Sequence, residues 1–161
     1  MPFDKKGILE LLATSLEHEI ASLRAGYESA RRASVEAPGR MQSRYDSMGI
    51  EAGWVASGLA KNLDEKVRAL VTLRSFNPPE GCKRVGLGVL LGIGAEPEKV
   101  EAVLFVLPVM GGTLLKIPGE DLPVRIVTPQ SPLGSSLMGK TVGDPVALRG
   151  ADKESEILFL E

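Results

Sequence analysis

Residues 134–141, GSSLMGKT, match the pattern G-x-x-x-x-G-K-[ST] at every fixed position. This is the pattern of a phosphate-binding loop, in which a glycine-rich turn and the N-terminus of a helix hold the phosphates of a nucleotide. The pattern raises the hypothesis of a nucleotide hydrolase. It works only in one context, where a buried strand runs directly into the first glycine and a helix begins at the Lys-Thr pair.

Several arginines in the N-terminal half form a second candidate site. Arg24 and Arg31 are seven residues apart and would share one face of a helix, and Arg40 and Arg44 follow. The whole chain has a net charge of -2, so it has no general attraction to nucleic acid or to anionic membranes. The arginines would therefore act as a local positive arm that contacts RNA or lines an acidic channel, or they form an ordinary solvated face.

Length and composition limit the classes of protein to consider. The chain has 161 residues, of which 43% are hydrophobic and 25% charged, as in a globular protein of one or two small domains. The single cysteine, Cys82, excludes a disulfide within the chain and fits a reducing compartment. Charges interrupt the first apolar run, which is typical of neither a signal peptide nor a membrane span. We expect a cytoplasmic protein without a membrane partner.

The first half of the sequence predicts two long helices. Apolar residues recur every three or four positions from about Asp4 to Ala37, and again from about Asp46 to Arg74. Pro38-Gly39 ends the first helix. The narrow apolar stripes predict an antiparallel coiled-coil hairpin over residues 1–76, with its tip at about 38–47 and Trp54 packed between the helices.

The second half predicts a sheet domain. Residues 77–82 form a linker, and glycine and proline then punctuate short apolar runs over residues 83–161. The runs predict strands at about 85–91, 100–107, 124–127, 146–149 and 156–160. Short connections favour an antiparallel sheet with one short helix, so the fold class is α+β, a helical hairpin followed by a sheet domain.

This arrangement argues against the nucleotide hypothesis. Six residues separate the strand that ends at Val127 from Gly134, and Val142-Gly143-Asp144-Pro145 cannot begin a helix. Helix signals lie earlier, with Ser131 as N-cap, Pro132 as first helical residue and Gly139 just past the C-terminus. We expect the helix to lie inside the pattern, and no nucleotide to be bound.

The same region resembles a known family. The segments Ile126–Gly134, Leu137–Lys140 and Val142–Asp144, together with the final strand, resemble the C-terminal signature of the GreA/GreB transcript-cleavage factors. In that family a coiled-coil hairpin precedes an FKBP-like sheet domain. The resemblance is specific over residues 126–148 and architectural over residues 1–80.

The resemblance implies a DNA-binding transcription elongation factor that binds bacterial RNA polymerase. The sheet domain would dock at the rim of the secondary channel through Ser131, Pro132 and Leu133. The hairpin would enter the channel and bring its tip to the active site, near the nascent RNA. Such a protein is an accessory factor rather than an enzyme.

At the tip the sequence departs from the family. There the family carries two carboxylates that help to hold Mg²⁺ in the polymerase active site, and oxygen ligands suit this ion. Asp46 falls where the first acid belongs, but Gly49 stands at the position of the second, with Glu51 nearby. Asp46 and Glu51 are the candidate catalytic residues, and Asp46 the candidate metal ligand. Alternatively, Asp46 simply caps the second helix.

Two other functions remain as alternatives. The chain could occupy the secondary channel as a competitor without cleavage activity. It could also be a protein-interaction regulator of the kind that controls nucleoside diphosphate kinase, although such regulators typically have a shorter arm.

Overall fold

The computed structural model describes residues 3–36, 46–148 and 154–161, and of residues 46–48 only the backbone. The chain divides into two compact units. One unit combines Met1–Glu10 with Ser75–Glu161, and the other is Leu11–Arg74. We describe each unit by itself.

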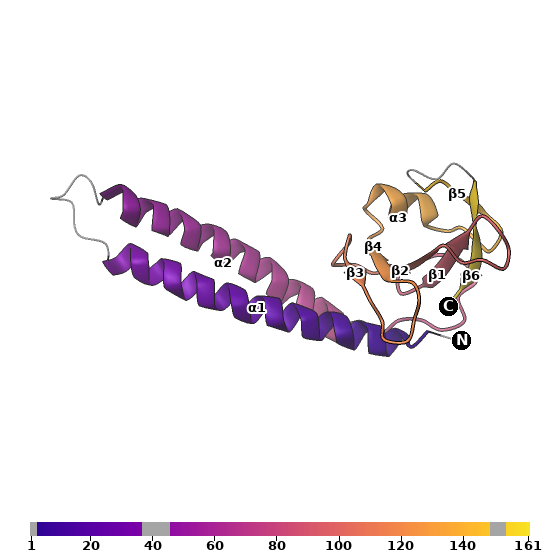
Figure 1. The fold of residues 1–161 in the computed structure, drawn as a ribbon, viewed down its shortest axis with the longest axis horizontal. Helices are drawn as coiled ribbons and strands as arrows, with labels where there is room; N and C mark the ends of the chain where they lie inside the picture. Colours follow the sequence, from indigo (N-terminus) through magenta and orange to yellow (C-terminus); the bar gives the residue numbers. More distant parts are fainter. Residues whose placement is uncertain (1–2, 37–45, 149–153) are drawn as a thin grey trace. The chain divides into compact units, whose positions relative to one another are not determined.

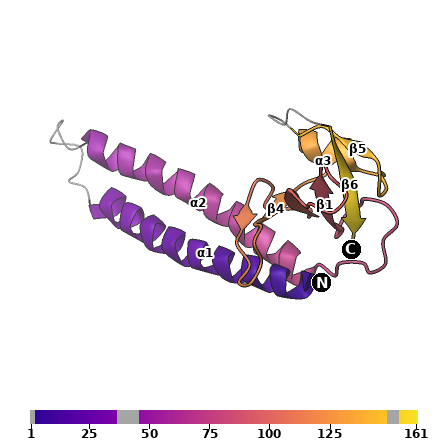
Figure 2. The same cartoon turned by 45° about the vertical axis from the view of Figure 1, so that its right-hand side comes forward.

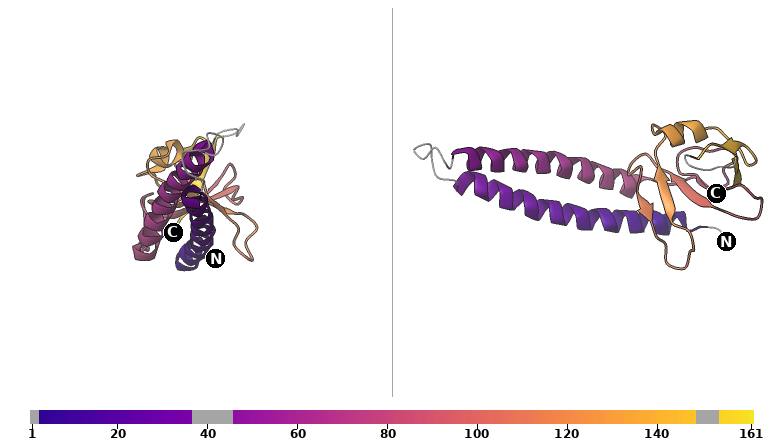
Figure 3. Two further views of the ribbon diagram at one scale, coloured as in Figure 1. Left: turned by 90° about the vertical axis from the view of Figure 1, so that its left-hand side faces the viewer. Right: turned by 45° about the horizontal axis from the view of Figure 1, so that its top comes forward.

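The two predicted long helices are present. Helix α1 spans Lys5–Glu36 and helix α2 spans Asp46–Ser75, and they lie side by side as an antiparallel hairpin (Figures 1 and 3). Two ion pairs join them, Lys66 to Glu19 at 2.5 Å and Arg74 to Glu17 at 2.7 Å. No helix among the described residues has the length and apolar character needed to cross a membrane.

The apolar seam of the hairpin is uneven along its length. Toward the N-terminal end of α1 and the C-terminal end of α2, the seam contains the buried side chains of Leu12, Leu16, Ile20 and Leu73. Among the side chains described in residues 23–36 and 49–60, which we call the distal hairpin, only Ala56 is buried. The two helices meet here at small residues, and the Ser34 hydroxyl donates a hydrogen bond to the Gly49 carbonyl at 3.1 Å. The distal hairpin is therefore held by much less apolar burial.

The other unit contains a six-stranded sheet in the order β3-β4-β2-β1-β6-β5. The strands are β1 (Leu90–Gly94), β2 (Ala102–Val106), β3 (Leu114–Leu115), β4 (Val124–Val127), β5 (Pro145–Val146) and β6 (Ser155–Leu160). Helix α3 (Pro132–Leu137) lies against one face of the sheet (Figure 2). Its Leu137 is buried in a cluster with residues of β1, β2, β4 and β6, including Leu91, Leu104 and Ile157. The predicted fold class, a helical hairpin followed by a sheet domain with one short helix, is confirmed.

The sequence predicted an antiparallel sheet, and this part of the prediction is wrong, because the sheet is mixed. Strands β2 and β4 pair in parallel, with Leu104 opposite Arg125, and the other strand pairs are antiparallel. Parallel pairing needs a long crossover, which sequence reasoning assumed would be a helix. Residues 107–123 provide the crossover without a helix, and they include β3, a two-residue strand that the sequence did not predict.

Strand β1 begins later than predicted, at Leu90 instead of about Val85. Gly88 interrupts the run because its φ is +79°, in the left-handed region that glycine adopts at little cost. Val85 instead exchanges backbone hydrogen bonds with the segment after α3. Its N–H donates to the Lys140 carbonyl and its carbonyl accepts from Gly139, both at 2.8 Å.

The start of α1 belongs to the same unit as the sheet. The ring of Phe3 stacks on that of Phe159 in β6, with centroids 6.1 Å apart. The Phe3 N–H donates to the Glu161 carboxylate at 2.8 Å, and the Lys5 ammonium donates to the carbonyls of Pro79 and Gly88. These contacts place the first turns of α1 with the sheet, whereas the sequence assigned the whole helix to the hairpin.

Candidate functional site

The first candidate site is the α3 corner, residues 126–148, where the sequence signature lies. Ser131 caps α3, since its hydroxyl accepts from the Gly134 N–H at 3.0 Å and donates to the Thr128 carbonyl at 2.7 Å. Pro132 is the first helical residue, where its missing N–H is not needed. The predicted N-cap and helix start are confirmed.

Two glycines of the corner are required by the backbone. A Cβ on Gly134 would lie 1.9 Å from the Thr128 carbonyl oxygen, so no larger residue fits without a backbone shift. Gly139 has a φ of +79°, which ends the helical segment and turns the chain toward Lys140. The position predicted for Gly139, just past the C-terminus of α3, is confirmed.

A tight turn over Thr141–Asp144 follows. The Asp144 carboxylate accepts from the Thr141 N–H at 2.7 Å and from its hydroxyl at 3.1 Å. The backbone hydrogen bond from Thr141 lowers the pKa of Asp144 below its usual value, with help from the hydroxyl bond and from the charges of Lys140 and Arg84. The turn leads into β5, and the Gly143 N–H donates to the Ile157 carbonyl of β6 at 2.8 Å.

These contacts decide how residues 134–141 are used. The first four residues of the pattern lie within α3, so the helix lies inside the pattern, as predicted. The Lys140 ammonium donates to the Pro145 carbonyl, and the Thr141 hydroxyl donates to Asp144. In a phosphate-binding loop these two residues begin a helix that faces the phosphates. Here both serve a turn, and the structure gives the nucleotide hypothesis no support.

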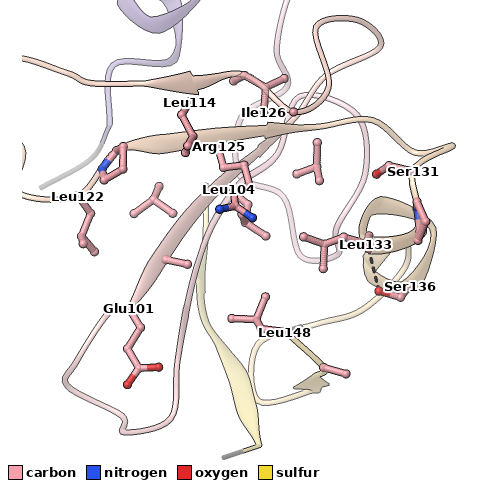
Figure 4. A pocket seen from close by; sticks show the side chains of 17 residues that line it. Glu101, Leu104, Leu114, Leu122, Arg125, Ile126, Ser131, Leu133, Ser136 and Leu148 are labelled. Carbon is pink, nitrogen blue, oxygen red and sulfur yellow. Dashed lines mark hydrogen bonds between the residues drawn. The ribbon is translucent and has the colours of Figure 1, made fainter. Parts of the chain in front are cut away.

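An apolar cleft of about 700 Å³ lies beside α3, and we call it the α3 cleft. It arises because a six-residue helix is about 9 Å long, whereas strands are spaced about 4.8 Å apart. Helix α3 therefore covers only part of its sheet face. Figure 4 shows the cleft between the helix and the sheet, and its walls include Leu104 of β2, Leu114 of β3, Arg125 of β4, Leu133 of α3 and Leu148 beyond β5.

The three predicted docking residues all border this cleft. Pro132 is exposed, Leu133 is half-buried against the core cluster, and the Ser131 hydroxyl is taken up by the helix cap. The structure thus places the three residues together at one rim. Their role in docking stays a prediction.

Sequence reasoning missed Arg125 and the cleft. In the strand sequence Val-Arg-Ile-Val, Arg125 shares a face with Val127, which lies in the core cluster. The sequence feature that could have revealed this site was a charged residue at a core-facing position of a strand. Arg125 is exposed because α3 does not extend over it.

The second candidate site is the distal hairpin, where one prediction is wrong. Trp54 does not pack between the helices, since the residue is 72% exposed. Ile50, one turn earlier on the same helix, is also exposed, as is Val35 at the end of α1. The helices approach here through glycines instead, and a Cβ on Gly53 would lie 3.3 Å from the Ser34 hydroxyl.

The predicted tip acids lie at the start of α2. Asp46 is its first residue, but its side chain lies outside the described part of the structure. Glu51 is exposed, and five residues correspond to about 140° around a regular helix. Among the described residues, no group of three or more His, Cys, Asp or Glu side chains could hold a metal ion. The roles of both acids stay predictions.

The predicted positive arm is only partly described. Arg24 and Arg31 are both exposed on α1, and Arg31 lies 3.9 Å from Glu28, an exposed pair that contributes little to stability. Arg40 and Arg44 lie outside the described residues. The RNA or channel contact of these arginines stays a prediction.

The fold and the sites define a two-part class of protein, in which a long helical hairpin precedes a sheet domain with an apolar cleft beside a short helix. No family model and no curated protein matches the sequence. Similar solved structures include GreA factor homolog 1 (Gfh1) of Thermus thermophilus, at 20% identity over 92% of this chain and 94% of that one, with a TM-score of 0.35.

Two further structures give similar values. A structure of the transcription factor Gfh1 has 17% identity over 95% of this chain and 92% of its own, with a TM-score of 0.37. Gfh1 of Thermus aquaticus has 19% identity over 92% of both chains, with a TM-score of 0.36. Likeness at this level does not assign a function to this chain.

Proposed function

We propose that this chain is a Gre-like transcription elongation factor of the bacterial cytoplasm. It binds RNA polymerase through the α3 corner and places its hairpin in the secondary channel. It acts as an accessory to the polymerase and is not itself an enzyme. The observation that carries the proposal is the sequence of residues 126–148, which resembles the C-terminal signature of the GreA/GreB family.

The described contacts of the α3 corner support this use of the signature. Ser131 and Gly134 hold the start of α3 in one conformation, and Gly139 with Asp144 fixes its exit. Pro132 remains exposed on this rigid support, beside the half-buried Leu133. A rigid, partly apolar rim suits docking onto a partner because little conformational entropy is lost on binding.

The hairpin supports the second part of the proposal. Its helices have 32 and 30 residues, which correspond to about 45 Å of length. The distal hairpin exposes Val35, Ile50 and Trp54, none of which its own packing requires. An arm of this length can reach a site distant from the docking domain, which a protein-interaction regulator with a short arm does not need.

The effect at the polymerase active site depends on the tip. Asp46 is the acid that matches the family pattern in position, and Gly49 stands where the second acid belongs. With one acid missing, occupancy of the channel without transcript cleavage is the alternative outcome. This alternative requires the same docking and differs only in the chemistry at the tip.

A transcript-cleavage assay tests the proposal. A stalled, backtracked RNA polymerase complex with labelled RNA is mixed with the protein in Mg²⁺, beside Asp46→Ala and, as control, Asp64→Ala from the exposed surface of α2. Short 3′ fragments that disappear with Asp46→Ala alone support a cleavage factor. Protection of the transcript from an authentic cleavage factor supports a competitor. If the protein neither cuts nor protects at micromolar concentration, the proposed function is wrong.

A further inference from the structure

The α3 cleft contains fewer free polar groups than its lining suggests. The Ser131 hydroxyl is bonded to Thr128 and Gly134, and the Ser136 hydroxyl donates to the Leu133 carbonyl at 2.7 Å, drawn as a dashed line in Figure 4. Two charged side chains remain at its walls, those of Arg125 and Glu101. A ligand of the cleft would therefore meet apolar walls and these two charges.

Arg125 lies between two leucines on the floor of the cleft. In the strand register it is opposite Leu104 on β2 and Leu114 on β3. Figure 4 shows its guanidinium directed along the floor beside Leu104. The structure records no hydrogen bond or ion pair from this guanidinium to another described residue. A guanidinium binds a carboxylate through two parallel hydrogen bonds, and the leucines beside Arg125 place apolar surface next to this contact.

Glu101 limits the charge of the ligand. In Figure 4 its carboxylate extends away from Arg125, at the opposite edge of the cleft. A ligand with several negative groups, such as a nucleotide, would meet one arginine and be repelled by Glu101. A ligand with one negative group can bind Arg125 and leave Glu101 in water.

We propose that the α3 cleft binds a small amphipathic anion, with its single carboxylate on Arg125 and its apolar body against Leu104, Leu133 and Leu148. The volume of about 700 Å³ falls within the range typical of sites for small molecules. This inference is independent of the proposed function, although a bound ligand would lie beside the predicted docking residues.

The experiment uses sodium decanoate as the anionic probe and 1-decanol as its neutral counterpart. Both are titrated into the full-length protein by isothermal calorimetry, and decanoate is expected to bind saturably to one site. Arg125→Gln should weaken decanoate about tenfold or more and leave the affinity for decanol unchanged. Lys99→Gln, which removes the same charge from an exposed position that does not line the cleft, should leave both affinities unchanged.

A second variant keeps Arg125 but gives its guanidinium a carboxylate partner within the protein. Leu114 is 56% exposed and pairs with Arg125 across the strands, so Leu114→Glu places a carboxylate beside the guanidinium. Decanoate should again bind about tenfold more weakly or worse. Leu87→Glu, at another exposed leucine of the same unit, is the control. Circular dichroism melting curves check that the variants are folded.

Three results would overturn the inference. The first is the absence of saturable decanoate binding to the wild-type protein. The second is decanoate binding that neither Arg125→Gln nor Leu114→Glu weakens. The third is an equal loss of decanoate and decanol binding in Arg125→Gln, which would mean that the arginine contributes packing and no charge recognition. Each can occur whether or not the chain binds RNA polymerase.

Discussion

The α3 corner and the distal hairpin use small residues in opposite ways. In the corner, Gly134 has no room for a Cβ and Gly139 needs a positive φ. In the distal hairpin, Gly26 and Gly58 lie in α-helices, and a Cβ on Gly58 would meet nothing within 4 Å. Folding therefore dictates these glycines of the corner, whereas it only tolerates Gly58 of the hairpin.

The two regions also differ in how deeply their large apolar residues are buried. Leu137 of the corner is fully buried, while Trp54 of the distal hairpin is 72% exposed. A tryptophan that is mostly exposed contributes little to the packing of its own helix pair. The comparison teaches that most of the corner's sequence serves the fold, and that the distal hairpin is free to carry residues chosen for contact with a partner.

The strongest test of this comparison truncates one large residue in each region. Leu137→Ala should lower the free energy of unfolding by about 3 kcal/mol, because it leaves a cavity in the core cluster. Trp54→Ala should change it by less than about 0.5 kcal/mol, because the side chain is mostly in water. Urea unfolding followed by circular dichroism measures both. A loss for Trp54→Ala as large as that for Leu137→Ala would show that the exposed tryptophan packs in solution.

A second test adds a methyl group to one glycine in each region. Gly134→Ala should destabilise the protein by about 2 kcal/mol, because the new Cβ would overlap the Thr128 carbonyl. Gly58→Ala should stabilise it by up to about 1 kcal/mol, because alanine favours the helix and the position is open. Thermal unfolding of the two variants compares them directly, and effects of equal sign would break the comparison.

A third test concerns the helix cap. Ser131→Ala removes the acceptor for the Gly134 N–H and should cost about 1 kcal/mol. Ser131→Asp retains an acceptor and should recover most of the loss. Urea unfolding of the pair provides the measurement. If the aspartate variant is no more stable than the alanine variant, the hydroxyl's bond to the Thr128 carbonyl matters more than the cap.

The smallest effect is expected from the Asp144 turn. The folded state lowers the pKa of Asp144 below its ordinary value of 3.8, chiefly through the hydrogen bond from the Thr141 backbone. The charged carboxylate therefore stabilises the fold above that value, and this contribution disappears as the pH falls through the lower, folded-state pKa. Asp144→Asn should flatten the acid limb of the stability curve, measured by urea midpoints between about pH 2 and 6. An acid limb identical to that of the wild type would contradict this role.

Sequence patterns predicted those features that depend on local chemistry. Proline, serine and glycine signals located α3 to the residue, and apolar periodicity located both long helices. The parallel pairing of β2 with β4 and the two-residue strand β3 were missed, because both depend on contacts between distant segments. Trp54 was misplaced because periodicity gives the buried face of a helix only approximately when small residues form the seam.

The candidate sites were predictable to a lesser extent. Ser131, Pro132 and Leu133 could be found because their order resembles a family signature, and the structure gathers them at one rim. Arg125 was not found, because its exposure depends on how far a short helix extends over the sheet. The tip acids were identified by position alone, and the side chain of Asp46 lies outside the described part of the structure.

The central claim, docking to RNA polymerase through the α3 corner, is tested most directly by affinity. Bacterial core RNA polymerase is immobilised and titrated with the full-length protein, with the double variant Pro132→Ala, Leu133→Ala, and with Leu87→Ala as an exposed control. We predict saturable binding at micromolar concentration or below, weakened about tenfold or more by the double variant and unchanged by the control. No binding to the core enzyme, or equal binding by all three proteins, would contradict the account.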